Sequence, residues 1–126
     1  MTEIMDIIRN TGFVPVVALK DVKKAVNLAK ALERGGIPII EVTYRTREAS
    51  DCIRAIHNEC SEVIVGAGTV LNVEQAKEAV DCGAMFIVTP GYNEDVVEYC
   101  CSNQIPVIPG VSNATEIQKG VKAGLK

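Results

Sequence analysis

Five short apolar runs recur along the chain at a nearly constant spacing, and this repetition restricts the fold more than any other feature. They begin 20 to 25 residues apart and cover residues 13–19, 37–43, 62–68, 85–90 and 105–110. Each run has the length of a strand, and the segments between them repeat apolar residues every three or four positions, as amphipathic helices do. Repeated strand–helix units of this kind predict right-handed connections and a parallel sheet.

The segments between the runs carry the signals that start and stop helices. One helix is expected to begin after Asp21, a favoured N-cap residue, and to end at a Gly-Gly pair. Asn72, with Gln75 three residues later, predicts a capping-box start for another helix. A short helix over residues 2–10 is expected before the first run. Further helices are expected over residues 47–60, from Asn93, and from Ser112 or Asn113.

The composition predicts a single packed domain. Hydrophobic residues make up 48% and charged residues 23% of the 126 positions, which argues against disorder. Aromatic residues are only 4%, so the core must be aliphatic, as it is around parallel strands buried on both faces. The net charge of −3 gives no reason to expect a nucleic acid as a partner.

The sequence shows no targeting or membrane signal. Its opening stretch, MTEIMDIIRN, carries acidic residues early and has no long apolar core, unlike a secretory signal. No segment approaches the roughly 20 apolar residues that a membrane helix needs. We therefore expect a cytoplasmic protein with no membrane partner.

The cysteines predict reduced thiols on helices rather than a disulfide framework or a metal site. There are five of them, an odd number, and no CxxC pair occurs. They are Cys52, Cys60, Cys82, Cys100 and Cys101.

Two architectures are built from such strand–helix units. An open, doubly wound sheet could be completed by five strands in a chain of this length, whereas a (β/α)8 barrel typically needs about 200 residues or more. Length alone therefore favours the open sheet. The residues that end the runs favour the barrel, because barrels place their functional groups at the carboxyl ends of the strands. These ends are small, rigid, polar or charged: Lys20, Glu41 to Arg45, Gly66 to Thr69, Thr89 to Gly91, and Pro109 to Ser112.

The stretch EVTYRT carries the strongest sign of chemistry. Strand periodicity puts Ile37, Ile39, Glu41, Thr43 and Arg45 on one face, so an apolar face turns acidic, hydroxylic and then basic. A partly desolvated Glu41 would have its pKa raised toward the range useful for proton transfer, and Arg45 could hold a carboxylate in bidentate fashion. The alternative is an ion pair between the two side chains. Their Cα atoms would lie about 13 Å apart along a strand, so a shared ligand or water fits better.

Other polar positions carry weaker signals. The stretch GAGT suggests a dinucleotide fingerprint, but Leu71 stands where its third glycine would be, so we expect the glycines to serve close packing. Thr69 is a candidate ligand contact, and Pro90 is either a strand stop or a ligand contact. We expect His57 to be a surface residue, because no acid–base partner is spaced around it.

Taken in chain order, four segments resemble the 2-keto-3-deoxy-6-phosphogluconate (KDPG) and 4-hydroxy-2-oxoglutarate (KHG) aldolases. They are GGIPIIEVTYRT, IVGAGTVLN, AMFIVTPGYNEDVVEYC and IPVIPGVSNATEI. The resemblance runs from about Ile8 to Lys126. It implies an α/β fold, a partial (β/α)8 TIM barrel in which residues 1–126 form a single incomplete domain with strands one to five of eight.

The resemblance also implies an activity in carbohydrate metabolism. Members are class I aldolases without a metal or organic cofactor, usually homotrimers, in which a lysine forms a Schiff base with the substrate's keto carbon. They cleave KDPG to pyruvate and glyceraldehyde 3-phosphate, or KHG to pyruvate and glyoxylate. By motif, Glu41 matches the proton-transferring glutamate and Arg45 the arginine that binds the pyruvate carboxylate. Thr69 and Pro90 match substrate-contacting positions.

One departure concerns the nucleophile. The family motif reads GLK-x-x-K-x-F-P with the second lysine as nucleophile, whereas this sequence ends at Lys126, which matches the first. We therefore expect the Schiff-base lysine to be absent from these residues and the chain alone to be inactive. Lys20 is better read as a rim lysine than as a substitute nucleophile, and a terminal Lys126 is a still weaker candidate.

Two other functions are compatible with strand–helix repeats. One is a non-catalytic, doubly wound binding or signalling module such as a receiver domain, which needs acidic residues after strand one and an Asp ending strand three; here these ends read VALK and GAGT. The other is a structural half-barrel that retains a pyruvate-binding corner. In a partial barrel the unpaired strand edges also favour association between copies.

Overall fold

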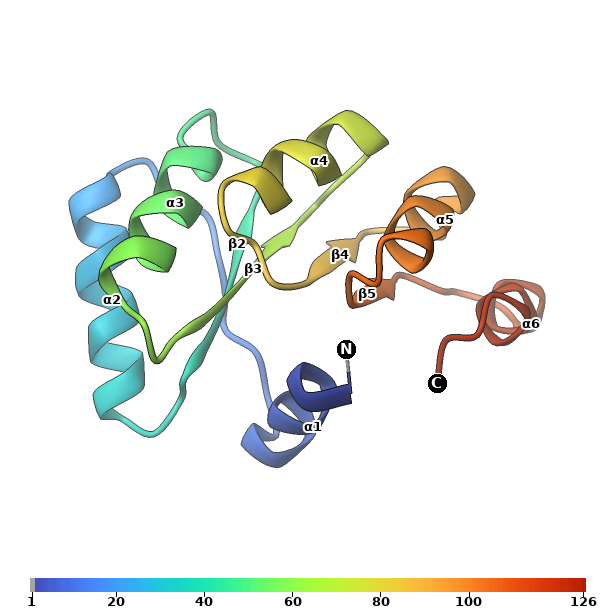
Figure 1. Cartoon of the computed structure of the whole chain (residues 1–126), viewed down its shortest axis with the longest axis horizontal. Coiled ribbons are helices and arrows are strands. Elements are labelled where there is room, and N and C mark those ends of the chain that lie inside the picture. Colours follow the sequence, from blue (N-terminus) through green and yellow to red (C-terminus); the bar gives the residue numbers. More distant parts are fainter. Residues whose placement is uncertain (1) are drawn as a thin grey trace.

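The computed structural model describes residues 2–126 and contains one sheet of five parallel strands. Each strand is followed by a helix, and a further helix precedes the first strand (Figure 1). The strands are β1 (Val16–Val17), β2 (Ile39–Thr43), β3 (Ile64–Gly68), β4 (Ile87–Thr89) and β5 (Val107–Pro109). The helices are α1 (Thr2–Thr11), α2 (Val22–Arg34), α3 (Ala49–Glu59), α4 (Val73–Asp81), α5 (Glu94–Ser102) and α6 (Ala114–Lys122).

The order of the strands decides between the two expected architectures. It is β1-β2-β3-β4-β5, so each connection steps to the next strand in the same direction. A doubly wound sheet reverses its direction at a switch point, and this sheet has none. The prediction of an open sheet, which rested on chain length, was therefore wrong. The prediction of a partial barrel, which rested on the strand ends, is confirmed. The doubly wound binding or signalling module is excluded with it.

The strands separate two apolar layers. On the outer face, residues such as Ile40, Val42 and Val65 pack against α2 to α5. On the inner face, Ile39, Ile64 and Phe86 pack against the apolar side of α1, which lies across the sheet from α2 to α5 (Figure 1). The inner face is the surface that a closed barrel would enclose, and α1 covers part of it.

Several helix starts follow the predicted capping residues. The side chains of Asp21, Asn72, Asn93 and Asn113 each accept a hydrogen bond from a backbone N–H in the first turn of the following helix. Gln75 also reaches back to accept from the N–H of Leu71 at 2.8 Å, which completes a capping box displaced by one residue.

The first strand is much shorter than expected. The run over residues 13–19 predicted a strand throughout, but only Val16 and Val17 pair with β2. Among the described residues β1 has a neighbour on one side only, and Phe13 and Val16 remain more than half exposed. A run of apolar residues forms a strand only where a partner lies beside it.

All five cysteines are free, and Cys52, Cys60, Cys82 and Cys100 are buried. Within residues 2–126, no group of three or more His, Cys, Asp or Glu side chains is arranged to hold a metal ion. In the same residues, no helix is both long enough and apolar enough to cross a membrane.

Candidate active site at the carboxyl ends of the strands

Strand β2 brings Glu41 into the interior of the partial barrel. Ile39 belongs to the inner apolar layer and Ile40 and Val42 to the outer one, so the alternation of a strand places Glu41 on the inner face. The residue is only 8% exposed. The burial expected from the sequence pattern is therefore present, and a carboxylate lies among aliphatic residues.

Two glycines of β3 make room for neighbouring side chains. A Cβ atom added to Gly66 would overlap the ring of Phe86, and one added to Gly68 would overlap the carboxyl group of Glu41. The φ angles of both glycines lie outside the left-handed region, so their backbone conformations do not demand glycine. As expected from the incomplete fingerprint, the GAGT stretch serves close packing.

The environment of Glu41 shifts its proton affinity. Burial raises the pKa of the Glu41 carboxyl above its ordinary value of 4.5, and the positive charge of Arg45 opposes the shift. Among the described residues, no side chain or backbone group donates a hydrogen bond to the Glu41 carboxylate. The carboxyl group is thus poised to exchange a proton with a molecule that enters the barrel mouth.

Arg45 lies beyond the end of the strand rather than on it. Strand β2 ends at Thr43, and Arg45 is in the following turn with its side chain exposed. The expectation that Arg45 continues the strand face was wrong, because the turn interrupts the period of two. Within residues 2–126 the guanidinium forms no ion pair, so the alternative of a direct pair with Glu41 is not realised. Its charge still acts on Glu41.

Two threonines of EVTYRT, to which the sequence analysis assigned no bonding role, hold the end of β1 beside the mouth. The hydroxyl of Thr43 donates to the carbonyl oxygen of Val17 at 3.0 Å, and that of Thr46 donates to the carbonyl of Leu19 at 2.6 Å. These bonds replace strand pairing beyond Val17, and they keep the exposed Lys20 next to the turn that carries Arg45. The two hydroxyls in EVTYRT were the available signal, but their acceptors lie on another strand.

Thr69 and Pro90 lie at the carboxyl ends of the next two strands. Thr69 directly follows β3 with a φ of 55°, a left-handed conformation that is rare for a β-branched residue. Pro90 directly follows β4 and lines a hollow of about 380 Å³ together with Leu71, Thr89, Gly91 and Tyr92. The Thr89 hydroxyl donates to the carbonyl of Gly91 at 2.6 Å, which fixes the turn around Pro90. The four predicted site residues therefore share one end of the sheet.

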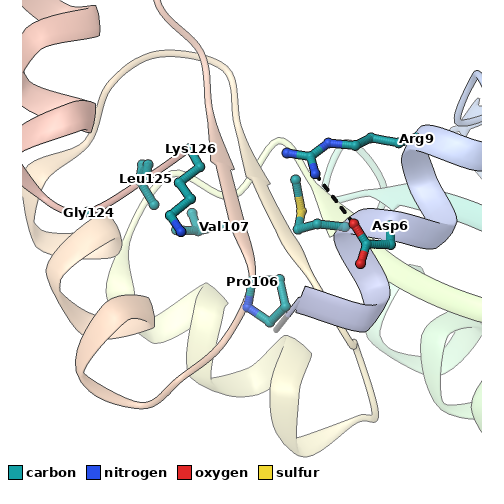
Figure 2. Close-up of a pocket in the computed structure, with 8 residues that line it drawn as sticks. Asp6, Arg9, Pro106, Val107, Gly124, Leu125 and Lys126 are labelled. Carbon is teal, nitrogen blue, oxygen red and sulfur yellow. Dashed lines mark hydrogen bonds and ion pairs between the residues drawn. The ribbon is translucent and has the colours of Figure 1, made fainter.

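Lys126 lies at the other end. It lines a hollow of about 290 Å³ with Met5, Asp6 and Arg9 of α1 and with Pro106, which precedes β5 (Figure 2). Because Pro106 marks the amino end of the strand, Lys126 lies away from Glu41 and Arg45.

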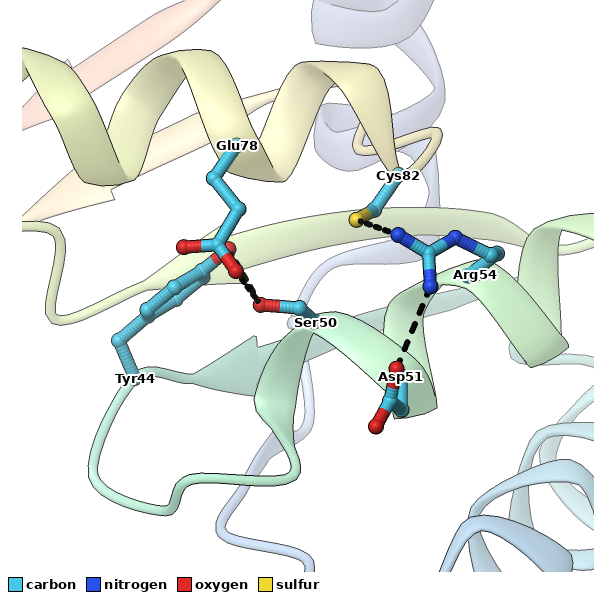
Figure 3. A network of polar contacts seen from close by, with 6 residues as sticks. All are labelled: Tyr44, Ser50, Asp51, Arg54, Glu78 and Cys82. Atoms are coloured by element: carbon cyan, nitrogen blue, oxygen red, sulfur yellow. Dashed lines mark hydrogen bonds and ion pairs between the residues drawn. The ribbon is translucent and has the colours of Figure 1, made fainter.

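A polar network on the outer side braces the turn that carries Arg45 (Figure 3). The Ser50 hydroxyl donates to Glu78 of α4 at 2.6 Å, and the Tyr44 hydroxyl lies 3.3 Å from Ser50. Because Ser50 has a single proton and gives it to Glu78, Tyr44 must be the donor to Ser50. Burial raises the pKa of Tyr44 to about 12, so the phenol keeps the proton that it donates to Ser50.

His57 is exposed on α3, as expected, and lies against Gly83, where an added Cβ would overlap the imidazole ring. The residue therefore contributes to packing between α3 and the end of α4.

Comparison with known proteins gives one consistent result. The family model for KDPG and KHG aldolase matches residues 4–126. The 2-dehydro-3-deoxy-phosphogluconate aldolase of Treponema pallidum is 46% identical over 125 residues, which are 99% of this chain and 60% of that protein. The chain thus spans about three fifths of the length of this curated relative.

Two solved structures give the same result. The KDPG aldolase of Zymomonas mobilis ZM4, solved with 3-phosphoglycerate, superposes with a TM-score of 0.92 at 34% identity, over 99% of this chain and 59% of that one. The KDPG aldolase of Legionella pneumophila superposes with a TM-score of 0.84 at 35% identity, over 88% of this chain and 54% of that one. In the Legionella structure, pyruvate is captured as a covalent carbinolamine intermediate.

Proposed function

The chain belongs to the KDPG and KHG aldolase family, and on that premise we propose that it carries the proton-transfer and carboxylate-binding part of a class I aldolase. The reaction cleaves KDPG to pyruvate and glyceraldehyde 3-phosphate, or KHG to pyruvate and glyoxylate. The observation that supports this most is the placement of Glu41. A buried carboxyl with a raised pKa lies just inside the barrel mouth, and an exposed guanidinium follows in the adjoining turn.

In the proposed reaction, Arg45 holds the carboxylate of the keto acid and fixes its orientation. A lysine amine replaces the keto oxygen, which leaves as water, and the resulting iminium accepts electrons from the breaking carbon–carbon bond. Glu41 takes the proton of the hydroxyl that becomes the aldehyde. The same carboxyl then returns a proton to the enamine carbon, and hydrolysis of the iminium releases pyruvate. Thr69 and Pro90 line the path of the substrate.

The proposed reaction needs a nucleophilic lysine that is not among residues 1–126. The resemblance puts it three positions after Lys126. A segment leaving Lys126 as a strand parallel to β5 would rise about 10 Å over three residues, from the amino end of the sheet toward the mouth. The proposal therefore gives the 126-residue chain a binding corner and a base, without Schiff-base formation of its own.

Reductive trapping tests the proposal. The chain is incubated with pyruvate and borohydride and then analysed by mass spectrometry, beside a version extended at its carboxyl end with the corresponding part of the Treponema pallidum relative. We expect no adduct on the chain alone, and both an adduct and aldol cleavage with the extended chain. An adduct on Lys20 or Lys126 of the chain alone would contradict the assignment of the nucleophile. An extended, folded chain that neither traps pyruvate nor cleaves KDPG or KHG would contradict the function.

Substitutions in the extended chain separate the proposed roles. Glu41→Gln is expected to lower kcat at least tenfold while pyruvate trapping persists, because binding does not need the proton acceptor. Arg45→Met is expected to raise KM, since the carboxylate loses its charged partner. Lys20→Ala serves as a matched control at the rim and should still give the adduct.

The assembly and the location belong to the same proposal. The family resemblance implies a homotrimer, and the sequence pattern leads us to expect a cytoplasmic protein. Sedimentation of the extended chain tests the trimer, and a monomer at all concentrations would contradict it.

A further inference from the structure

The Glu41 carboxylate is held by packing rather than by hydrogen bonds. None of the described residues donates to its oxygens, and no opposite charge forms an ion pair with it. No fully buried side-chain oxygen lacks a partner in the described residues, so the carboxylate oxygens reach the solvent at the mouth. A buried glutamate without such partners keeps one orientation only where the surrounding atoms leave it one space. The shape of that space therefore decides where the proposed proton acceptor points.

Strand β3 supplies the space. Gly66 lies opposite Glu41 in the parallel pairing, and Gly68 lies opposite Thr43, two residues nearer the mouth. The heavy atoms that a Cβ at Gly68 would meet first are Oε1, Cδ and Cγ of Glu41. The Glu41 side chain therefore leans along the strand direction and lies over the bare backbone of Gly68.

The space deeper in the barrel is already filled. The ring of Phe86 lies over Gly66, and both Phe86 and Ile39 are fully buried in the inner apolar layer. A carboxyl group displaced from Gly68 cannot move inward past these side chains. We expect it to move outward, toward the solvent.

We infer that Gly68 is a positioning residue, whose missing side chain forms the slot that holds the Glu41 carboxylate inside the mouth. The φ angle of Gly68 lies outside the left-handed region, so the backbone does not require glycine there, and the contact with Glu41 supplies the reason for it. This inference rests on the proposed function for its catalytic meaning. Its structural content can be tested without any activity.

A double-mutant cycle on the 126-residue chain tests the slot. Gly68→Ala is expected to lower the urea midpoint of the wild-type background clearly. In the Glu41→Ala background the same change should leave the midpoint nearly unchanged, because the atoms it would meet have been removed. Gly35→Ala, at the end of α2 where an added Cβ meets its neighbours at an ordinary 3.4 Å, is the matched control and should have little effect in either background.

The cycle remains decisive if Gly68→Ala does not fold. A folded Glu41→Ala/Gly68→Ala double variant would then support the slot, since removing the carboxylate restores the fold. Equal losses in both backgrounds, or a double variant that also fails to fold, would overturn the inference.

Titration of the Glu41 carboxyl is a second test. If Gly68 served only to stabilise the fold, its substitution would leave the pKa of Glu41 unchanged. The carboxyl carbon is followed by 13C NMR against pH in glutamate-labelled chain, and Glu41→Gln identifies its signal. In Gly68→Ala the pKa of Glu41 is expected to fall toward its ordinary value, because the carboxylate moves toward water. Arg45, the charged group that acts on Glu41, is unchanged in the variant. An unchanged pKa in a folded Gly68→Ala chain would overturn the inference.

The activity of the extended chain tests whether Gly68 affects catalysis through Glu41. Gly68→Ala should lower kcat at least tenfold with little change in KM, and in the Glu41→Ala background it should lower kcat no further. Loss of kcat in both backgrounds would contradict an action through Glu41. If the extended chain shows no aldolase activity at all, the proposed function fails, while the cycle and the titration still decide the role of Gly68.

Discussion

At Glu41, burial sets the pKa of a carboxyl above its ordinary value and so links the stability of the fold to pH. From the ordinary value of 4.5 upward, the folded state holds this proton more firmly than the unfolded state does. Unfolding then releases a proton, and the free energy of unfolding falls as the pH rises through this window. Above the raised pKa, Glu41 is ionised in both the folded and the unfolded state, and the free energy of unfolding falls no further.

Glu41→Gln should remove this loss, because the amide has no charge to desolvate. We expect the variant to be more stable than the wild type at neutral pH, by about 1.4 kcal/mol for each unit by which the Glu41 pKa is raised. The advantage should shrink as the pH falls below the ordinary glutamate pKa. Urea unfolding of both chains between about pH 4 and 8 measures it. A stability difference that is independent of pH would show that Glu41 does not titrate as argued.

Thr69 presents the second residue-level prediction. Its left-handed backbone costs roughly 1–2 kcal/mol in a residue with a Cβ, and glycine removes this cost while losing about 0.5–1 kcal/mol of chain entropy on folding. We therefore expect Thr69→Gly to be as stable as the wild type or up to about 1.5 kcal/mol more stable, by urea unfolding. Gln104→Gly is the matched control, because Gln104 has a φ of 58° in an exposed turn after α5. A clear destabilisation by Thr69→Gly alone would mean that the threonine side chain stabilises the fold.

The sequence shows the burial of Glu41 but not the conformations around it. Alternation with Ile39 and Val42 is local, so it can be read from a strand. Arg45 and Thr69 lie in turns, where that periodicity no longer holds. The slot at Gly68 arises only when β2 and β3 lie side by side, which no local pattern encodes.

At the scale of elements, α3 and α4 are joined by two polar contacts one helical turn apart (Figure 3). Ser50 donates to Glu78, and Arg54, four residues later, donates to the sulfur of Cys82 at 3.0 Å. The first contact also reaches Tyr44, so it connects both helices to the turn that carries Arg45.

Ser50→Ala should therefore cost stability as well as loosen this turn. One short hydrogen bond to a partly solvated carboxylate is worth about 1 kcal/mol, and urea unfolding measures it. Hydrogen exchange of the amides after β2 should become faster in the variant. Ser61→Ala, whose exposed hydroxyl lies 3.4 Å from Glu62, is the control and should change neither quantity. An equal effect of both substitutions would contradict a specific role for Ser50.

Helix starts could be predicted more closely than strand ends. A cap such as Asp21 or Asn72 bonds within its own first turn, so the sequence contains both partners. A strand needs a partner that the sequence does not show, which is why the run over residues 13–19 yields only Val16–Val17. The parallel, barrel-like order could be predicted because it is repeated in every unit and in the motifs at the strand ends.

At the scale of the whole molecule, the described residues leave the outer edges of β1 and β5 without a neighbouring strand. Unpaired edges beside exposed apolar residues such as Phe13 and Val16 favour association. We expect the sedimentation coefficient of the 126-residue chain to rise with concentration. Val16→Lys should weaken the association, because it places a charge at the edge of β1.

Leu71→Lys is the control for this prediction. Leu71 is 55% exposed and follows β3, the central strand of the sheet, so a lysine there should leave the association through the strand edges unchanged. A monomer at every concentration, or equal effects of the two lysines, would contradict association through the strand edges.

The strand order, which follows the chain order, has a consequence for how the protein is made. The closest packing joins consecutive units: β1 with β2, β2 with β3, α2 with α3, and so on to β5. As the chain leaves the ribosome from its amino end, each unit can therefore pack on the one before it. Few of these contacts need a segment that has not yet been synthesised. Helix α1 is the exception, because its Ile4, Ile7 and Ile8 belong to an inner layer that includes Phe86 and Ile108. The first helix to be synthesised must wait for most of the sheet before its final packing surface exists.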